Sequence, residues 1–134
     1  MLKPARSQDD SVAAFKKQKQ FIDSIIDHYS VIAVSKEPLI GIDSIMGKYK
    51  GYVYLNNNNN KIVKIELTSD SIQLKTMLYC EADRIIKIQE NNDVFYCIND
   101  CYYLNSIKQT SPSVVKRLAL YKQTLTACIA IFSQ

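Results

Sequence analysis

The feature that most constrains this chain is a change in the spacing of its apolar residues. Between residues 12 and 29, apolar side chains recur every three or four positions, as in an amphipathic helix. From Lys48 to Leu104 they alternate with polar residues, which is typical of strands that bury one face. The helical spacing returns from Val114 to Phe132. This pattern predicts a sheet between two helices.

The two helices have recognisable starts. Ser11 is a suitable N-cap for a helix over Val12–Tyr29, which leaves residues 1–10 as a flexible basic arm ahead of a single domain over residues 11–134. Polar residues and Pro112 mark the start of the second helix. Its last two turns are apolar or small almost all round, which predicts deep burial or cover by a partner. Its apolar stripe comprises Val114, Leu118, Tyr121, Leu125, Cys128, Ile129 and Phe132.

The strands are separated by short polar segments rich in Asn, Asp and Ser, which favour tight turns and antiparallel pairing. The predicted fold class is therefore α+β: an N-terminal amphipathic helix, an antiparallel meander of five to seven strands, and a C-terminal amphipathic helix packed on the sheet. Both helices are expected to cover the apolar face of the sheet. A short strand is expected over Val31–Val34 and is expected to be broken at Glu37-Pro38.

Charge is distributed unevenly along the 134 residues. Residues 1–20 carry five basic and two acidic side chains, residues 21–104 carry eight and eleven, and residues 105–134 carry four and none. The simplest interpretation is that basic ends lie against an acidic middle; a basic face for a phosphate-bearing partner is the alternative. No signal peptide is recognisable, and no apolar run reaches the roughly 18 residues of a membrane span, so a soluble, cytoplasmic protein is expected.

Sequence motifs for catalysis or cofactor binding are not recognisable. The three glycines do not form a phosphate-binding loop, and His28 is the only histidine. We therefore expect no enzymatic activity and assign no catalytic, cofactor-binding or metal-binding residue. Of the four cysteines, Cys97 and Cys101 form a C-x3-C pair. Buried reduced thiols are the favoured interpretation, with a disulfide or a metal site as alternatives.

The best candidate for a functional surface combines lysines, tyrosines and the apolar end of the last helix. On a strand, Lys50, Tyr52 and Tyr54 point the same way, and such a set suits sheet packing, a protein interface or nucleic-acid binding. The candidate partner surface is Lys48, Lys50, Tyr52, Tyr54, Leu120 and Ile131.

The leading functional hypothesis is a small non-catalytic protein-binding module of the inhibitor, immunity-protein or secretion-chaperone type. Its acidic middle would suit a basic partner such as a toxin or effector. The alternative is nucleic-acid binding through the Lys/Tyr strand face and the basic termini. A homodimer through the C-terminal helix is a separate expectation.

Overall fold

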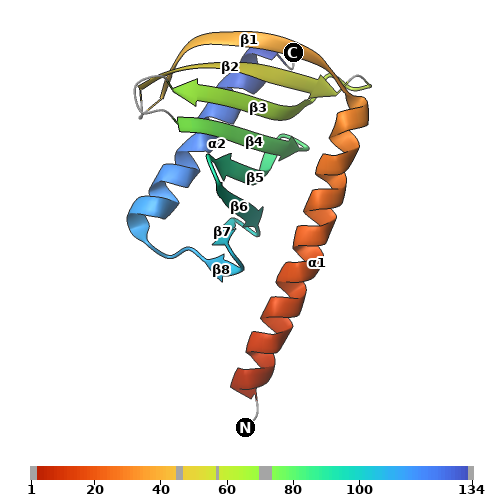
Figure 1. Cartoon of the computed structure of the whole chain (residues 1–134), viewed down its shortest axis with the longest axis vertical. Coiled ribbons are helices and arrows are strands. Elements are labelled where there is room, and N and C mark those ends of the chain that lie inside the picture. The colour runs from red at the N-terminus through yellow and green to blue at the C-terminus, as the bar shows by residue number, and fades with distance from the viewer. Residues whose placement is uncertain (1–2, 45–46, 57, 70–73, 133–134) are drawn as a thin grey trace.

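An eight-stranded antiparallel sheet lies between two helices in the computed structural model (Figure 1). The backbone is described for residues 3–44, 47–56, 58–69 and 74–132, and the side chains for residues 13–28, 52–56, 58–68 and 74–130. The elements in chain order are α1 (Lys3–Ile32), β1 (Ala33–Ser44), β2 (Gly47–Asn56), β3 (Ile62–Ser69), β4 (Leu74–Glu81), β5 (Arg84–Glu90), β6 (Asp93–Ile98), β7 (Cys101–Leu104), β8 (Ile107–Lys108) and α2 (Pro112–Phe132).

The strands lie in the sheet in their sequence order, so each pairs with the next. Three of the two-residue turns have positive φ at both central residues, as in type I′ hairpins: Ala82–Asp83, Asn99–Asp100 and Asn105–Ser106. This confirms the α+β class and the antiparallel meander. The sheet reaches eight strands because β8, of two residues, adds a short final edge.

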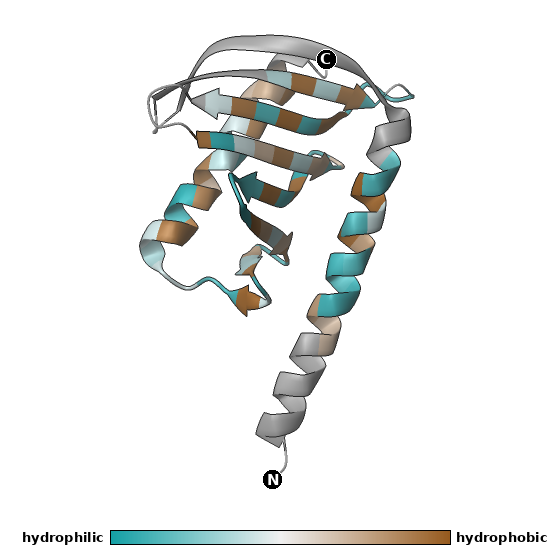
Figure 2. Cartoon of the chain, in the orientation of Figure 1, coloured by the Kyte–Doolittle hydropathy of each residue, from teal (hydrophilic) through white to brown (hydrophobic). Residues whose placement is uncertain are grey.

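The apolar face of the sheet is buried under α2, which passes behind the strands in Figure 1. Leu118, Tyr121, Leu125 and Cys128 of α2 pack against buried residues that recur at every second position of β2–β7. Figure 2 shows the corresponding alternation of hydrophobic and hydrophilic residues along the strands. The helix expected from Pro112 onward, with this stripe turned to the sheet, is therefore confirmed.

Helix α1 packs on the opposite face of the sheet, so the expectation that both helices cover one face is wrong. Phe15 and Ile22 form a small buried cluster with Tyr96, whose neighbours in β6 point toward α2. The alternation of side chains along a strand places these two sets on different sides. Phe21, one of the apolar residues between positions 12 and 29 expected to be buried, is 63% exposed. Among the described side chains, α1 therefore buries much less than α2.

Two boundaries differ from the sequence prediction. Helix α1 begins at Lys3, so Ser11 is not its N-cap, and the backbone of residues 3–10, assigned to the basic arm, is helical. Pro4 fits this start because the first turn of a helix tolerates proline. Strand β1 runs through Pro38, which pairs with Tyr52 of β2. The expected break at Glu37-Pro38 is wrong because β1 is an edge strand, where a missing N–H donor is tolerated.

A buried polar network fixes the first half of α2 to the sheet. The Tyr121 hydroxyl donates to Glu90 Oε2 at 2.5 Å and lies 3.3 Å from Thr76 Oγ1, while Arg117 pairs with Glu90 Oε1 at 2.9 Å. Glu90 is buried, so these partners replace the water it loses. Within the described ranges, neither helix combines the length and the hydropathy that a membrane crossing would need.

Single truncations should separate the roles of the two helices. Leu118→Ala removes a fully buried side chain from the main core and should lower the free energy of unfolding by about 3 kcal/mol. Phe15→Ala removes a contact from the smaller cluster and should mainly raise amide hydrogen exchange in residues 13–28. Urea unfolding combined with native-state hydrogen exchange measures both. Equal global destabilisation by the two substitutions would contradict this assignment.

The turn between β4 and β5 offers a stabilising substitution. Ala82 is exposed and has φ of 52°, a region that the Cβ atom disfavours and glycine adopts without cost. Ala82→Gly should therefore raise the free energy of unfolding by about 0.5–1 kcal/mol. The matched control is Ala127→Gly in the interior of α2, which should lower it by about 1 kcal/mol. Thermal unfolding of the two variants beside the parent protein would show these opposite signs.

Candidate functional site

A row of alternating lysines and tyrosines crosses the face of the sheet that α2 does not cover. Directly paired residues are Tyr54 with Lys64, Lys64 with Tyr79, Tyr79 with Lys87, and Lys87 with Tyr96. Each strand from β2 to β6 thus contributes one residue, and we call these five the Lys–Tyr row. In register, the row continues to Tyr103 and Lys108.

The two lysines of the row lie over the tyrosine rings beside them. Lys64 Nζ is 5.0 Å from the Tyr54 ring centroid and 5.7 Å from that of Tyr79. Lys87 Nζ is 5.7 Å from the Tyr79 centroid and 5.0 Å from that of Tyr96. Both ammonium groups are within the range of cation–π attraction. The row is therefore a preassembled series of cations between aromatic rings.

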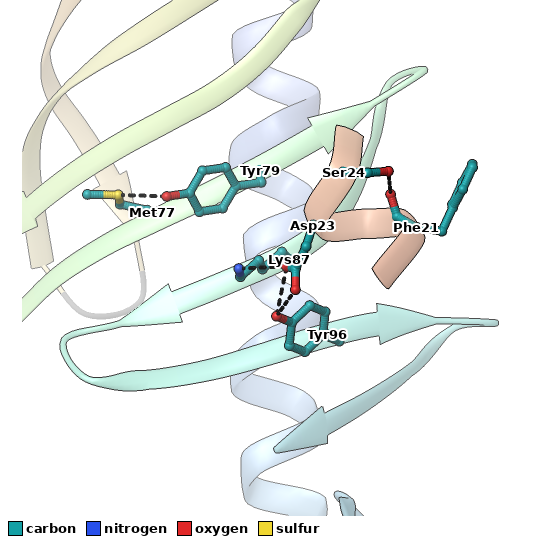
Figure 3. A network of polar contacts seen from close by, with 7 residues as sticks. All are labelled: Phe21, Asp23, Ser24, Met77, Tyr79, Lys87 and Tyr96. Atoms are coloured by element: carbon teal, nitrogen blue, oxygen red, sulfur yellow. Dashed lines mark hydrogen bonds and ion pairs between the residues drawn. The ribbon is translucent and has the colours of Figure 1, made fainter. Parts of the chain in front are cut away.

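Helix α1 occupies one end of the row (Figure 3). Asp23 Oδ1 lies 3.1 Å from Lys87 Nζ, and the Tyr96 hydroxyl donates to both Asp23 oxygens, at 2.8 and 3.1 Å. Phe15 packs edge-on against Tyr96, with ring centroids 6.0 Å apart and an interplanar angle of 88°. One carboxylate and one aromatic ring of α1 thus contact the Lys87 ammonium and the Tyr96 side chain at this end of the row.

The other end of the row, on β2–β4, is half-exposed. Tyr54, Lys64 and Tyr79 are each partly accessible, and Tyr52, on the same face, is 41% exposed. Glu66 accepts a hydrogen bond from the Tyr54 hydroxyl at 3.2 Å and pairs with Lys75 at 3.1 Å. This accessible surface, formed by Tyr52, Tyr54, Lys64, Glu66, Lys75, Met77 and Tyr79, is the candidate functional site.

The local electrostatics keep the tyrosines protonated and Glu66 ionised at neutral pH. Burial, followed by the charge of Glu66, raises the pKa of both Tyr54 and Tyr79. Burial and the bond to Asp23 raise the pKa of Tyr96. Burial alone would raise the pKa of Glu66, but its bonds to Lys75 and Tyr54 and the nearby Lys64 charge leave that pKa lowered. The site presents hydroxyl donors and lysine cations together with one engaged carboxylate.

The residues predicted for the partner surface fall on different parts of the fold. Tyr52 and Tyr54 lie at the candidate site. Lys48 and Lys50 belong to β2 by backbone register, but their side chains lie outside the described part of the chain, as does that of Ile131 in α2. Leu120 is half-buried on α2, which covers the opposite face. The structure therefore brings the two tyrosines together but places Leu120 elsewhere.

Sequence reasoning missed Lys64, Tyr79, Lys87 and Tyr96 as members of one site. Each was recognisable as a strand residue, but their alignment depends on register. The turn pairs Glu81 with Arg84, and regular pairing from there would set Tyr79 opposite Ile86. An irregularity between Tyr79 and Cys80 moves Lys87 into this position instead. A one-residue bulge of this kind has no recognisable signal in the spacing of apolar residues.

A cavity of about 590 Å³ opens between the two helices at the end of the sheet. The turns at residues 82–83 and 99–100 form its edge, together with Phe21 of α1 and Leu125 of α2. Of its charged side chains, Glu81, Arg84, Asp100 and Lys122 are exposed, and Asp83 is half-buried. The one histidine, His28, is exposed elsewhere on α1. Most of the charged groups therefore lie at the rim of this cavity.

The cysteine that lines this cavity is a poor nucleophile. Burial raises the pKa of Cys97 to about 12 although Lys122 opposes the shift, and an activated thiol needs a lowered pKa. All four cysteines are free thiols. Cys97 shares the α2 side of the sheet with Tyr102, its cross-strand partner, whereas Cys101 points to the other side, so the C-x3-C pair is divided between two faces. Among the described residues, no cluster of His, Cys, Asp and Glu has the makings of a metal site.

The chain matches no known protein family, no curated protein and no solved structure.

Buried thiols should make the protein less stable in alkali. The pKa of Cys97 is about 12 and that of Cys128 about 11, against an ordinary value of 9. Below pH 9 both states keep the proton; above it the unfolded chain ionises first, so stability falls as pH rises. Between about pH 9.5 and 11, Cys97→Ala should reduce this slope by up to about 1.4 kcal/mol per pH unit. Urea unfolding over this pH range measures the slope, and identical slopes would contradict the burial of Cys97.

Proposed function

We propose that this protein is a small non-catalytic module that binds another protein in the cytoplasm. The observation that carries the proposal is the half-exposed end of the Lys–Tyr row, built on rigid, paired strands and left uncovered by α1. Tyrosines supply large contact area at low entropic cost, and protein interfaces are enriched in them. An inhibitor, an immunity protein or a secretion chaperone, which occludes or escorts its partner, would use a preformed surface of this kind.

A protein partner suits this surface better than a nucleic acid does. Base stacking needs open ring faces, but Lys64 Nζ already lies over the rings of Tyr54 and Tyr79. Glu66 is ionised on the same face and would repel phosphate groups. Nucleic-acid binding through the Lys/Tyr face remains the alternative function. It predicts an affinity that falls steeply with salt, which titration with a labelled oligonucleotide at two salt concentrations tests.

The distribution of charge bears on the kind of protein bound. Four described carboxylates of the acidic middle segment, Asp23, Glu66, Asp83 and Glu90, are engaged in ion pairs. Other acidic residues, such as Glu81 and Asp100, lie at the hairpin turns on the rim of the cavity. A basic toxin or effector would have to use these turns. The candidate site itself, which contains the two cations Lys64 and Lys75 and the one carboxylate Glu66, favours an acidic partner.

The exposed aromatic residue of the site provides the test. Tyr52→Ala removes its side chain and should weaken capture of the partner from the native host at least about tenfold, as expected for a central interface tyrosine. Ile107→Ala is the matched control, because Ile107 is 66% exposed on β8. Quantitative affinity purification with the parent protein and both variants measures the effect.

Equal loss of the partner with both substitutions, or with neither, would contradict the proposed surface. Sedimentation of the parent protein at two concentrations separates this proposal from self-association through the C-terminal helix. A dimer insensitive to Tyr52→Ala would place the contact between copies on α2 instead.

A further inference from the structure

The Lys–Tyr row contains two units of similar geometry. In each, a lysine lies between two tyrosines on neighbouring strands, at 5.0 Å from one ring centroid and 5.7 Å from the other. Lys64 stands between Tyr54 and Tyr79, and Lys87 stands between Tyr79 and Tyr96, so the central Tyr79 belongs to both. The shared geometry gives both lysines a preference for an anion, although in the Lys64 unit the Tyr54 hydroxyl already donates to Glu66 and the Tyr79 hydroxyl to Met77 Sδ.

The Lys87 unit shows what this preference is, because α1 fills it. The carboxylate of Asp23 accepts hydrogen bonds from the Lys87 ammonium and the Tyr96 hydroxyl, and Phe15 packs against the outer face of the same tyrosine. A charge-assisted bond to an ammonium is short and strong when the pair is partly shielded from water, and the Lys87 side chain is only 17% exposed. Helix α1 thus acts as an internal ligand that offers a carboxylate and an aromatic ring.

In the Lys64 unit, no described carboxylate bonds to the lysine and to a tyrosine hydroxyl together. Glu66, two positions along β3, is engaged with Lys75 and with the Tyr54 hydroxyl. No ion pair joins Lys64 to a carboxylate within the described part of the chain; its ammonium lies over the two rings, and the charge of Glu66 is nearby. Tyr52 and Met77 lie one row further along the same face, paired in register through Glu66. Tyr52 and Met77 could contact an apolar side chain of a bound segment, as Tyr96 and Tyr103 contact Phe15.

We propose that the Lys64 unit binds a carboxylate side chain from an acidic, amphipathic segment of the partner protein, in the manner in which the Lys87 unit binds Asp23. The inference rests on the proposed function and names the chemistry of the partner. The carboxylate meets the Lys64 ammonium, and an apolar side chain on the same segment packs on Tyr52 and Met77. A phosphate dianion fits less well than a single carboxylate, because its larger negative charge is repelled more strongly by Glu66 on the same strand.

The proposal is tested on the full-length protein with two labelled peptides. The acidic probe has the sequence of residues 13–28 with the changes K16E, K17E and K19E; the neutral probe has Gln at these positions and Asn in place of Asp23 and Asp27. Fluorescence anisotropy should show the acidic probe binding at least about tenfold more tightly than the neutral one. Absence of binding of the acidic probe up to about 1 mM would overturn the proposal.

Three lysine variants locate the binding. Lys64→Gln should weaken binding of the acidic probe about tenfold, while Lys64→Arg, which keeps the cation, should retain it. Lys116→Gln, exposed on α2 on the other side of the sheet, should leave it unchanged. Equal binding by the parent protein and Lys64→Gln overturns the proposal. Loss of probe binding with Lys87→Gln but not with Lys64→Gln also overturns the proposal, because the probe would then occupy the position of α1 at the Lys87 unit.

Two further outcomes separate this proposal from its alternatives. Tighter binding of an oligothymidylate than of the acidic peptide, lost with Lys64→Gln, would make the unit a phosphate site and overturn the proposal. A host partner whose capture depends on Tyr52 but not on Lys64 would leave the proposed function standing and overturn this inference alone. A host partner whose capture depends on neither Tyr52 nor Lys64 would overturn both the proposed function and this inference.

Discussion

Burial of one face of the sheet under α2 is the interaction on which the rest of this structure depends. The strands from β2 to β7 contribute every second residue to a single core, and α2 closes it with Leu118, Tyr121, Leu125 and Cys128. Successive side chains of a strand point to opposite faces of the sheet. When every second residue is buried in this core, the residues between them must lie on the opposite face. The Lys–Tyr row is therefore a direct consequence of how the core is built.

The register of strand pairing decides which residues of this opposite face lie next to one another. Residues with positive φ lie in the turns that join β4 to β5 and β5 to β6, at Ala82–Asp83 and at Asn91. Antiparallel pairing from β2 to β6 brings lysines and tyrosines of different strands into one row. The bulge between β4 and β5 is part of this alignment, since it sets Lys87 rather than Ile86 opposite Tyr79. The cation–π contacts that follow are individually weak, but they hold the ammonium groups in place between rings.

Helix α1 has a different relation to the sheet from that of α2. It buries few of its described side chains and contacts the row through Asp23, Phe15 and Lys19, which lies 5.8 Å from the Tyr96 ring centroid. These contacts are polar and aromatic, as at an interface between proteins, and not those of a continuous core. The end of the row that α1 leaves open is also made of a lysine between two tyrosines. The contacts of α1 with Lys87 and Tyr96 therefore indicate what kind of group the open end could bind.

The sequence alone determined the order and type of most elements, all but the full length of β1, the start of α1 and the short β8, because a period of 3.6 or 2 in the apolar residues reports directly on which faces are buried. It predicted the C-terminal helix at Pro112, the meander, and the shared face of Tyr52 and Tyr54. Tertiary structure decided which face each helix covers and how β1 continues through Pro38 as an edge strand. It also decided which residues of different strands stand side by side. Those outcomes depend on pairing between distant segments and on one bulge. The spacing of apolar residues along the sequence predicts neither.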